Sequence, residues 1–327
     1  MAFRLKLVPE KTTWDFFRWA SLTFGASVVG VVASIILVAV VGLNFGIDFK
    51  GGTTIRTESA EVVDVGAYRG ALEELQMGDV SITEVRDPTF RPDQNVAMIR
   101  VQAQAGQEAL APEDVARVQA ALTKVAPDVK FTSVETVGPK VSGELITSAV
   151  IAVLAATAAI CGYIWLRFEW QFSLGAVAAL IHDVVVTVGI FALFRFKFDL
   201  TTIAALLAIL GYSINDTVVV FDRLRENLMK YKTMPLRDVM NLSVNETLSR
   251  TLMTSGTTLL TLTCLMIFGG DVIRGFVFAI FVGIVLGTYS SIYVAKNIVL
   301  YLGVKRDWSK PTDDAPGPKG NQLYTGK

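Results

Sequence analysis

Residues 200–221 read Leu-Thr-Thr-Ile-Ala-Ala-Leu-Leu-Ala-Ile-Leu-Gly-Tyr-Ser-Ile-Asn-Asp-Thr-Val-Val-Val-Phe, an apolar run with a single charged residue, Asp216. At about 1.5 Å per residue, a helix of this length crosses the roughly 30 Å hydrocarbon core of a bilayer. A carboxyl group inside such a helix costs about 2.5–3.5 kcal/mol on insertion scales, and intramembrane acids mark ion or proton pathways by default. The run therefore predicts a membrane helix, with Asp216 as the first candidate functional residue.

Five further apolar runs are long enough to cross a membrane. The composition agrees, because 52% of the residues are hydrophobic and the mean hydropathy is +0.49. We therefore expect a polytopic α-helical membrane protein with six transmembrane helices. The first run is longer than the apolar region of a signal peptide, so we interpret it as a retained anchor. The five runs lie at 21–43, 145–166, 171–194, 251–268 and 275–297.

Lys and Arg are concentrated in three segments that six spans would place on one side of the membrane. These are an N-terminal segment 1–20, a loop 222–249 and a tail 304–327. By the positive-inside rule this side is the cytoplasm, so both termini are expected to be cytoplasmic. The short outer loop with Arg195 and Lys197 is a minor exception. The tail has too few apolar residues to form a core, and we expect it to be disordered.

The segment 44–143, between the first two spans, has the pattern of one small folded domain outside the cytoplasm. The order βαββαβ is that of a ferredoxin-like α+β domain, so we expect one periplasmic domain of this kind. The helical spacing of Val115, Val118 and Leu122 predicts that these side chains face the sheet. The remaining spans then form a bundle in 144–303. The expected elements are a strand at 47–57, a helix at 61–76, strands at 80–86 and 95–102, a helix at 112–125 and a strand at 129–136.

Two roles are open for Asp216. It could carry protons, or it could be a structural carboxylate in a polar helix contact, with Tyr212, Ser213 and Asn215 as the local candidates for partners. Because intramembrane acids usually mark function, we favour transport.

Arg250 opens the fifth span on the same side of the membrane as Asp216. Its guanidinium could pair with Asp216, or it could extend to the headgroups as an ordinary anchor. The hydroxyls of Thr254 and Ser255 could line a polar path, although small hydroxylated residues also let helices pack closely.

His182 and Asp183 lie near the middle of the third span. Successive helix residues point about 100° apart, so we expect the two side chains to serve different places. Asp183 could extend the path from Asp216 or hydrogen-bond a neighbouring helix, and we favour the path. His182 is the only histidine, which excludes a multi-histidine metal site, and we expect no metal and no cofactor.

Two glycine motifs flank the outer domain. They are Phe45-Gly-Ile-Asp-Phe-Lys-Gly-Gly52 and Val137-Gly-Pro-Lys-Val-Ser-Gly-Glu144. We interpret both as turns, and as hinges, where a membrane helix meets the folded domain. The junction residues are Asp48, Gly51, Gly52, Gly138, Pro139 and Gly143.

Taken together, these motifs resemble the SecF family, the smaller membrane subunits of bacterial SecDF protein-export complexes, in the resistance-nodulation-division (RND) superfamily. The resemblance covers about 45–300 and leaves out the N-terminal segment and the tail. Besides the glycine motifs, it rests on Ile181-His-Asp183, Gly211-Tyr-Ser-Ile-Asn-Asp216, Ser249-Arg-Thr251, Gly269-Gly270 and Arg274-Gly-Phe276.

The resemblance implies a protein of the bacterial inner membrane that works with a SecD-like subunit and the SecYEG translocon. Such complexes use the proton-motive force to help draw a translocating preprotein out on the periplasmic side. In that family, the acid and the arginine that match Asp216 and Arg250 are linked to the movement of protons. A net charge of zero argues against a nucleic-acid partner.

Three alternatives remain open at this point. An RND-type exporter of small molecules or lipids would need larger outer domains, and a non-transporting scaffold would use Asp216 only for packing. An intramembrane protease built on Asp183 and Asp216 is disfavoured, because their expected depths differ and no flanking motif supports it. No P-loop, nucleotide fingerprint or Ser/His/Asp set is present, so we do not expect an enzyme.

Overall fold

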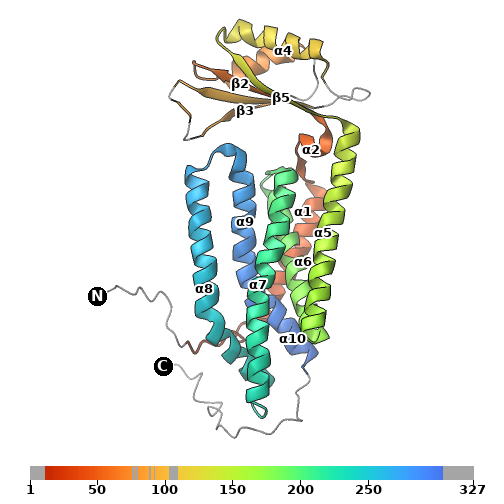
Figure 1. Ribbon diagram of the computed structural model, residues 1–327, viewed down its shortest axis with the longest axis vertical. Coiled ribbons are helices and arrows are strands. Elements are labelled where there is room, and N and C mark those ends of the chain that lie inside the picture. The colour runs from red at the N-terminus through yellow and green to blue at the C-terminus, as the bar shows by residue number, and fades with distance from the viewer. Residues whose placement is uncertain are drawn as a thin grey trace, which may run out of the picture.

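The computed structural model describes residues 12–75, 77, 80–87, 90–91, 93–102 and 110–304. A bundle of long helices stands below a small sheet domain, and α10 lies at the end of the bundle opposite that domain, here called the far end (Figure 1). In the described residues, six helical segments are long and apolar enough to cross a membrane. They are α1 (Ala20–Val40), α5 (Pro139–Arg167), α6 (Trp170–Leu193), α7 (Leu200–Lys230), α8 (Leu236–Phe268), and α9 (Asp271–Ser290), which continues through a π-helix η1 (Ser291–Ala295) into α10 (Lys296–Leu302).

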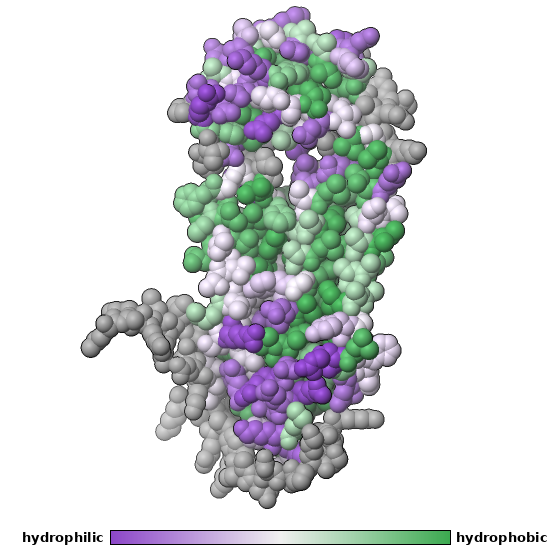
Figure 2. Space-filling model, in the orientation of Figure 1, coloured by the Kyte–Doolittle hydropathy of each residue, from purple (hydrophilic) through white to green (hydrophobic). Residues whose placement is uncertain are grey.

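On the face shown in Figure 2, apolar side chains predominate over the middle of the bundle, polar side chains gather at the far end, and the sheet domain is mixed. This is the surface expected of a helix bundle that crosses a bilayer once per helix. The six expected spans are therefore found, although their ends differ from the expected ones by several residues.

The prediction of a loop at 222–249 is wrong. Helix α7 runs on to Lys230 and α8 begins at Leu236, so most of this segment is a helical hairpin that extends the bundle at its far end. Ion pairs on the hairpin surface explain why its charged residues are compatible with helix: Arg223 pairs with Glu226 at 2.6 Å within α7 and with Glu246 of α8 at 2.7 Å.

The sheet domain contains the six elements expected of it, in the expected order. Its four strands are antiparallel and lie in the order β3-β4-β2-β5. Val118 and Leu122 are fully buried in the core and Val115 packs against it, as their spacing predicts. The elements are β2 (Gly52–Ser59), α3 (Val65–Glu73), β3 (Val80–Val85), β4 (Asn95–Gln102), α4 (Pro112–Val125) and β5 (Lys130–Val137).

The expected first strand, 47–57, is wrong over its first residues. Residues Ile47–Lys50 form a short helix, α2, and strand β2 begins only at Gly52. The glycine pair between them explains the break, because Gly51 and Gly52 have φ values of 74° and 139°, a region that favours glycine.

A second, two-stranded sheet lies between the sheet domain and the bundle, and the sequence pattern did not predict it. In it β1 (Asn44–Phe45) pairs in parallel with β6 (Lys197–Phe198). The described residues therefore form one parallel and one antiparallel sheet. Strands of two residues leave no alternating pattern, so only the folded chain reveals this pairing.

Close helix packing in the bundle depends on glycine at Gly189, where α6 crosses α1. A Cβ atom there would lie 2.3 Å from the Cβ and 2.7 Å from the Cα of Ser34, so one helix would have to move. We expect Gly189→Ala to cost about 1–3 kcal/mol. Gly162→Ala is the matched control, because a Cβ at Gly162 meets nothing within 4 Å. Heating the detergent-solubilised variants and following the monodisperse fraction measures the difference; equal thermal stability would contradict the prediction.

Candidate functional site

Asp216 lies inside the bundle on α7, where it faces α8, and its side chain is only partly satisfied. The residue is 6% exposed, and its Oδ1 accepts a hydrogen bond of 2.8 Å from the Thr251 hydroxyl. Its other oxygen, Oδ2, is buried and accepts no hydrogen bond of normal geometry among the described residues, although the Ser291 hydroxyl lies close enough to act on the carboxylate. A buried acceptor without a partner is costly. A proton added at Oδ2 would relieve part of that cost without breaking the bond to Thr251.

Arg250, the neighbour of Thr251, is exposed on the surface of α8. It is close enough for its charge to act on Asp216, but the described part of the chain shows no hydrogen-bonded ion pair between them. The structure therefore brings the two residues into electrostatic range and leaves the guanidinium at the surface.

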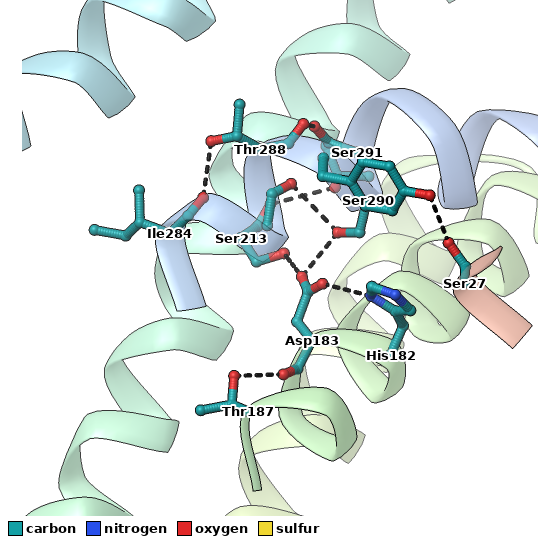
Figure 3. A network of polar contacts seen from close by, with 12 residues as sticks. Ser27, His182, Asp183, Thr187, Ser213, Ile284, Thr288, Ser290 and Ser291 are labelled. Atoms are coloured by element: carbon teal, nitrogen blue, oxygen red, sulfur yellow. Dashed lines mark hydrogen bonds and ion pairs between the residues drawn. The ribbon is translucent and has the colours of Figure 1, made fainter. Parts of the chain in front are cut away.

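Asp183 of α6 is fully buried, and donors from three helices surround it (Figure 3). Its Oδ2 accepts hydrogen bonds from the hydroxyls of Ser213 on α7, at 2.6 Å, and Ser290 on α9, at 2.8 Å. Its Oδ1 lies 2.9 Å from Nδ1 of His182, and its backbone carbonyl accepts a bond from Thr187. Asp183 thus joins three helices, and both of its carboxylate oxygens are satisfied.

The expectation that His182 and Asp183 serve different places is wrong. The imidazole turns back onto the adjacent carboxylate, and its ring lies 6.0 Å from that of Tyr289. Tyr289 in turn bonds to the Ser27 hydroxyl of α1 at 2.9 Å. The 100° step between neighbouring residues separates their Cβ directions, but a histidine with two rotatable bonds can close that angle.

Asp183 and Asp216 lie in one layer of polar side chains. Among the described residues, no side chain forms hydrogen bonds to both carboxylates. Ser213 binds Asp183 and lies about one helical turn before Asp216 on the same helix. Ser255 of α8 bonds to Thr288 of α9 at 2.8 Å, which extends the layer. Separate partners mean that no proton is shared between the two acids, which argues against a protease-like dyad.

Two residues expected to line the path or to support Asp216 lie elsewhere. Asn215 is exposed on the outer surface of α7. Thr254 is exposed on α8, where its hydroxyl bonds back to the carbonyls of Arg250 and Thr251. In contrast, Thr251 and Ser290 hold the two acids directly, and their roles depend on helix packing that periodicity alone does not reveal.

The first glycine motif is tied to the start of α7. Oδ2 of Asp48 accepts a bond of 3.1 Å from the Leu200 backbone N–H, the first residue of that helix. Gly46 donates to the Phe198 carbonyl at 2.8 Å, and a Cβ at Gly46 would lie 2.7 Å from Cε of Lys197. Hydrogen bonds therefore join the segment that leads into the sheet domain to the helix that carries Asp216.

Asp199 strengthens the same junction from the other side, as the N-cap of α7. Although burial opposes the charged form, the Thr201 hydroxyl, the Lys197 ammonium and the Thr202 backbone N–H together hold the pKa of Asp199 below its usual value. A charged carboxylate also suits the positive end of the helix dipole. The side chain therefore caps α7 across the neutral pH range.

The second glycine motif is a much shorter connection. Strand β5 ends at Val137, Gly138 caps the next helix, and Pro139 is the first residue of α5. Gly143 lies within α5, and a Cβ there would meet nothing within 4 Å. The expected turn is therefore a single residue, and the rest of the motif is helix.

Comparisons with known proteins agree with this architecture. Residues 117–305 match the family "Protein export membrane protein SecD/SecF, C-terminal", and residues 36–60 match the "SecD/SecF GG Motif". The chain is 68% identical over 315 residues to "Protein translocase subunit SecF" of Cereibacter sphaeroides, which covers 96% of this chain and 97% of that one. A relative of the same name from Rhodobacter capsulatus is 68% identical over 321 residues, covering 96% of each.

Two solved structures are also similar. The crystal structure of SecDF, a translocon-associated membrane protein from Thermus thermophilus, aligns with a TM-score of 0.79 at 35% identity, over 90% of this chain and 39% of that one. SecDF in a super-membrane-facing form aligns with a TM-score of 0.67 at 36% identity, over the same shares. The chain therefore spans about two fifths of each SecDF chain.

Proposed function

Because the chain belongs to the SecF family of protein translocase subunits, we propose that it works with a SecD-like subunit and uses the proton-motive force to assist Sec protein export. The observation that carries the proposal is Asp216, a buried acid in a membrane-spanning helix, one of whose oxygens accepts no hydrogen bond within the described part of the chain. In this proposal SecYEG delivers the translocating preprotein, and protons pass through the bundle. An exporter of small molecules is set aside, since the relatives are translocase subunits.

The proposed step is reversible binding of one proton at Oδ2 of Asp216. The carboxylate then becomes neutral, so its attraction to the Arg250 charge is lost, and release of the proton restores it. Each proton that crosses the membrane makes available about 2.3 kcal/mol per 100 mV. That is enough to change the relative populations of two helix arrangements by more than tenfold.

The route from Asp216 to the sheet domain runs along α7. A shift of this helix would be passed to Asp48 through the bond at Leu200, and so to α2 and strand β2. A cavity of about 690 Å³ lies between the sheet domain and the bundle, lined by residues of both, among them Arg100, Glu135 and Phe278. This space leaves room for the domain to tilt, with the Gly51–Gly52 pair and Gly138 as the pivots.

We further propose that the sheet domain is a ferredoxin-like domain in the periplasm and that both termini lie in the cytoplasm of a bacterium. The support for the fold is the βαββαβ order with strand order β3-β4-β2-β5. The support for the orientation is the basic far end of the bundle.

Cysteine labelling tests the orientation. In a chain without Cys161 and Cys264, Ala116→Cys on the exposed face of α4 should react with an impermeant maleimide added to the periplasmic side. Ala315→Cys should react only after the inner membrane is opened. Labelling with the opposite pattern would overturn the orientation.

The proton step itself is tested by preprotein export in membrane vesicles, with and without an imposed proton gradient. The decisive comparison is between the wild type and Asp216→Asn. If the protein is a scaffold that does not transport, the wild type and Asp216→Asn should export preprotein at the same rate under a gradient.

A further inference from the structure

The N-terminal segment 12–19, here called the strap, folds back onto the far end of the bundle, more than 200 residues away in sequence. The side chain of Asn245 on α8 accepts a hydrogen bond from the Trp14 N–H at 2.9 Å and donates one to the Trp14 carbonyl at 2.8 Å. Asn241, one turn away, accepts a bond from the Phe16 N–H at 3.0 Å. The side chains of two asparagines on α8 therefore hold the backbone of the strap in a fixed register.

This register inserts the ring of Phe16 into the bundle directly below Asp216. Phe16 is buried in an apolar cluster with Val220, Val244, Leu248 and Ile292. Val220 lies one turn beyond Asp216 on α7, and Leu248 lies one turn from Thr251 on α8, in both cases toward the far end. An apolar layer, completed by Phe16, thus separates the site at Asp216 from the far end.

Lys296 lies below this layer. It is a buried lysine that has no part in the proton step proposed above. It is 1% exposed, and its Nζ has no hydrogen-bond partner among the described residues. Nζ instead lies 3.9 Å from the ring centre of Phe17 and 5.3 Å from that of Phe16. Cations in such positions are attracted to the faces of aromatic rings. Lys296 therefore attracts the same two rings that the strap inserts.

The surroundings of Lys296 are compatible with reversible separation of the strap from the bundle. It directly follows the π-helix η1, a local irregularity that is frequent at functional sites. The charged groups nearest to it are Asp15 of the strap and Arg237 of α8, which form an ion pair of 3.5 Å with each other at the surface. Tyr293 completes the aromatic surroundings at 5.9 Å. Besides the asparagine bonds, the strap is held by the surface ion pair of Asp15 and by the burial of Phe16 and Phe17.

We infer that the strap is a gate: Phe16 seals the far side of Asp216 from the cytoplasm, and Lys296 holds Phe16 and Phe17 in the sealed position. The inference rests on the proposed function, since a seal has a purpose only if protons pass through Asp216. It adds a component to that function, because a coupled transporter has to close one side of its ion site while the other is open.

Accessibility measures the seal directly. We use vesicles that contain the complex with its SecD-like partner, expose the cytoplasmic face, and carry a chain without Cys161 and Cys264. Val220→Cys reports the apolar layer, and its reaction with an impermeant maleimide reports how often the layer opens. Ala205→Cys, fully buried near the sheet domain, reports global loosening. Both reporters are combined in turn with Phe16→Ala, with Lys296→Met, and with Trp19→Ala, which removes an aromatic ring of the strap that is 59% exposed.

We expect Phe16→Ala and Lys296→Met to raise labelling at position 220 about tenfold or more, with Trp19→Ala close to the parent and position 205 protected throughout. Labelling at 220 within about twofold of the parent, or an equal rise at 205, overturns the inference. Proton leak under an imposed gradient is the second readout. It should increase in Phe16→Ala and return to the parent level when Asp216→Asn is added. If 220 opens but no variant shows proton flux that depends on Asp216, the seal stands and the proton-coupled function fails.

Discussion

Asp216→Asn should assemble with the SecD-like partner and yet export preprotein at the same rate with and without a proton gradient. Asparagine has nearly the same shape, and its carbonyl oxygen can still accept the bond from Thr251. It cannot take up and release a proton, so the gradient has no group on which to act. At 100 mV the loss corresponds to about 2.3 kcal/mol per proton, or roughly fiftyfold in an equilibrium.

Asp222→Asn is the matched control for this prediction. Asp222 lies on the same helix, is about half exposed, and pairs with Arg167 at 2.9 Å. Its replacement removes the same charge from α7 without touching the buried site, so the gradient should still stimulate export. If Asp216→Asn also keeps its stimulation, Asp216 is structural, and the coupling group lies at Asp183 or in the partner subunit.

The membrane spans could be predicted from the sequence because hydropathy depends on composition over about twenty residues. The hairpin 222–249 could not, because charge indicates where a segment lies relative to the bilayer and says little about its conformation. Arg223 illustrates the difference: it counts toward the predicted cytoplasmic side as a basic residue, and it also forms ion pairs that suit a helix. The same limit applies to α2, where two glycines override a strand-like pattern.

The candidate site was predictable only in part, for a related reason. The cost of a charge in an apolar run identifies Asp216 from the sequence alone. Its partner Thr251 depends on how α7 and α8 pack. Lys296 was missed because it lies near the end of an apolar run, where a lysine ordinarily extends to the surface. Only the strap, which comes from the other end of the chain, turns that position into a buried one.

Asp183→Leu should destabilise the bundle more than Asp216→Leu, because Asp183 has more hydrogen-bond partners than Asp216. Leucine would leave the Ser213 hydroxyl and the imidazole of His182 without their acceptor, and would leave the Ser290 hydroxyl only its longer bond of 3.3 Å to the Gly287 carbonyl. Each buried polar group without a partner costs about 1–3 kcal/mol. The variant should therefore accumulate poorly and lose its monodisperse peak at a lower temperature than Asp222→Leu, the matched change at an exposed acid.

Asp183→Asn then separates a structural role from a role in the proton path. The amide keeps the volume, and the serine hydroxyls can rotate to accept from it as well as donate to it, so we expect the protein to remain folded. Both oxygens of Asp183 have hydrogen-bond partners within the bundle, whereas Oδ2 of Asp216 accepts no hydrogen bond among the described residues. We therefore expect Asp183→Asn to keep most of its gradient-stimulated export. A loss as complete as that of Asp216→Asn, in a protein of normal stability, would instead place Asp183 on the proton path, with Ser213 as its connection to Asp216.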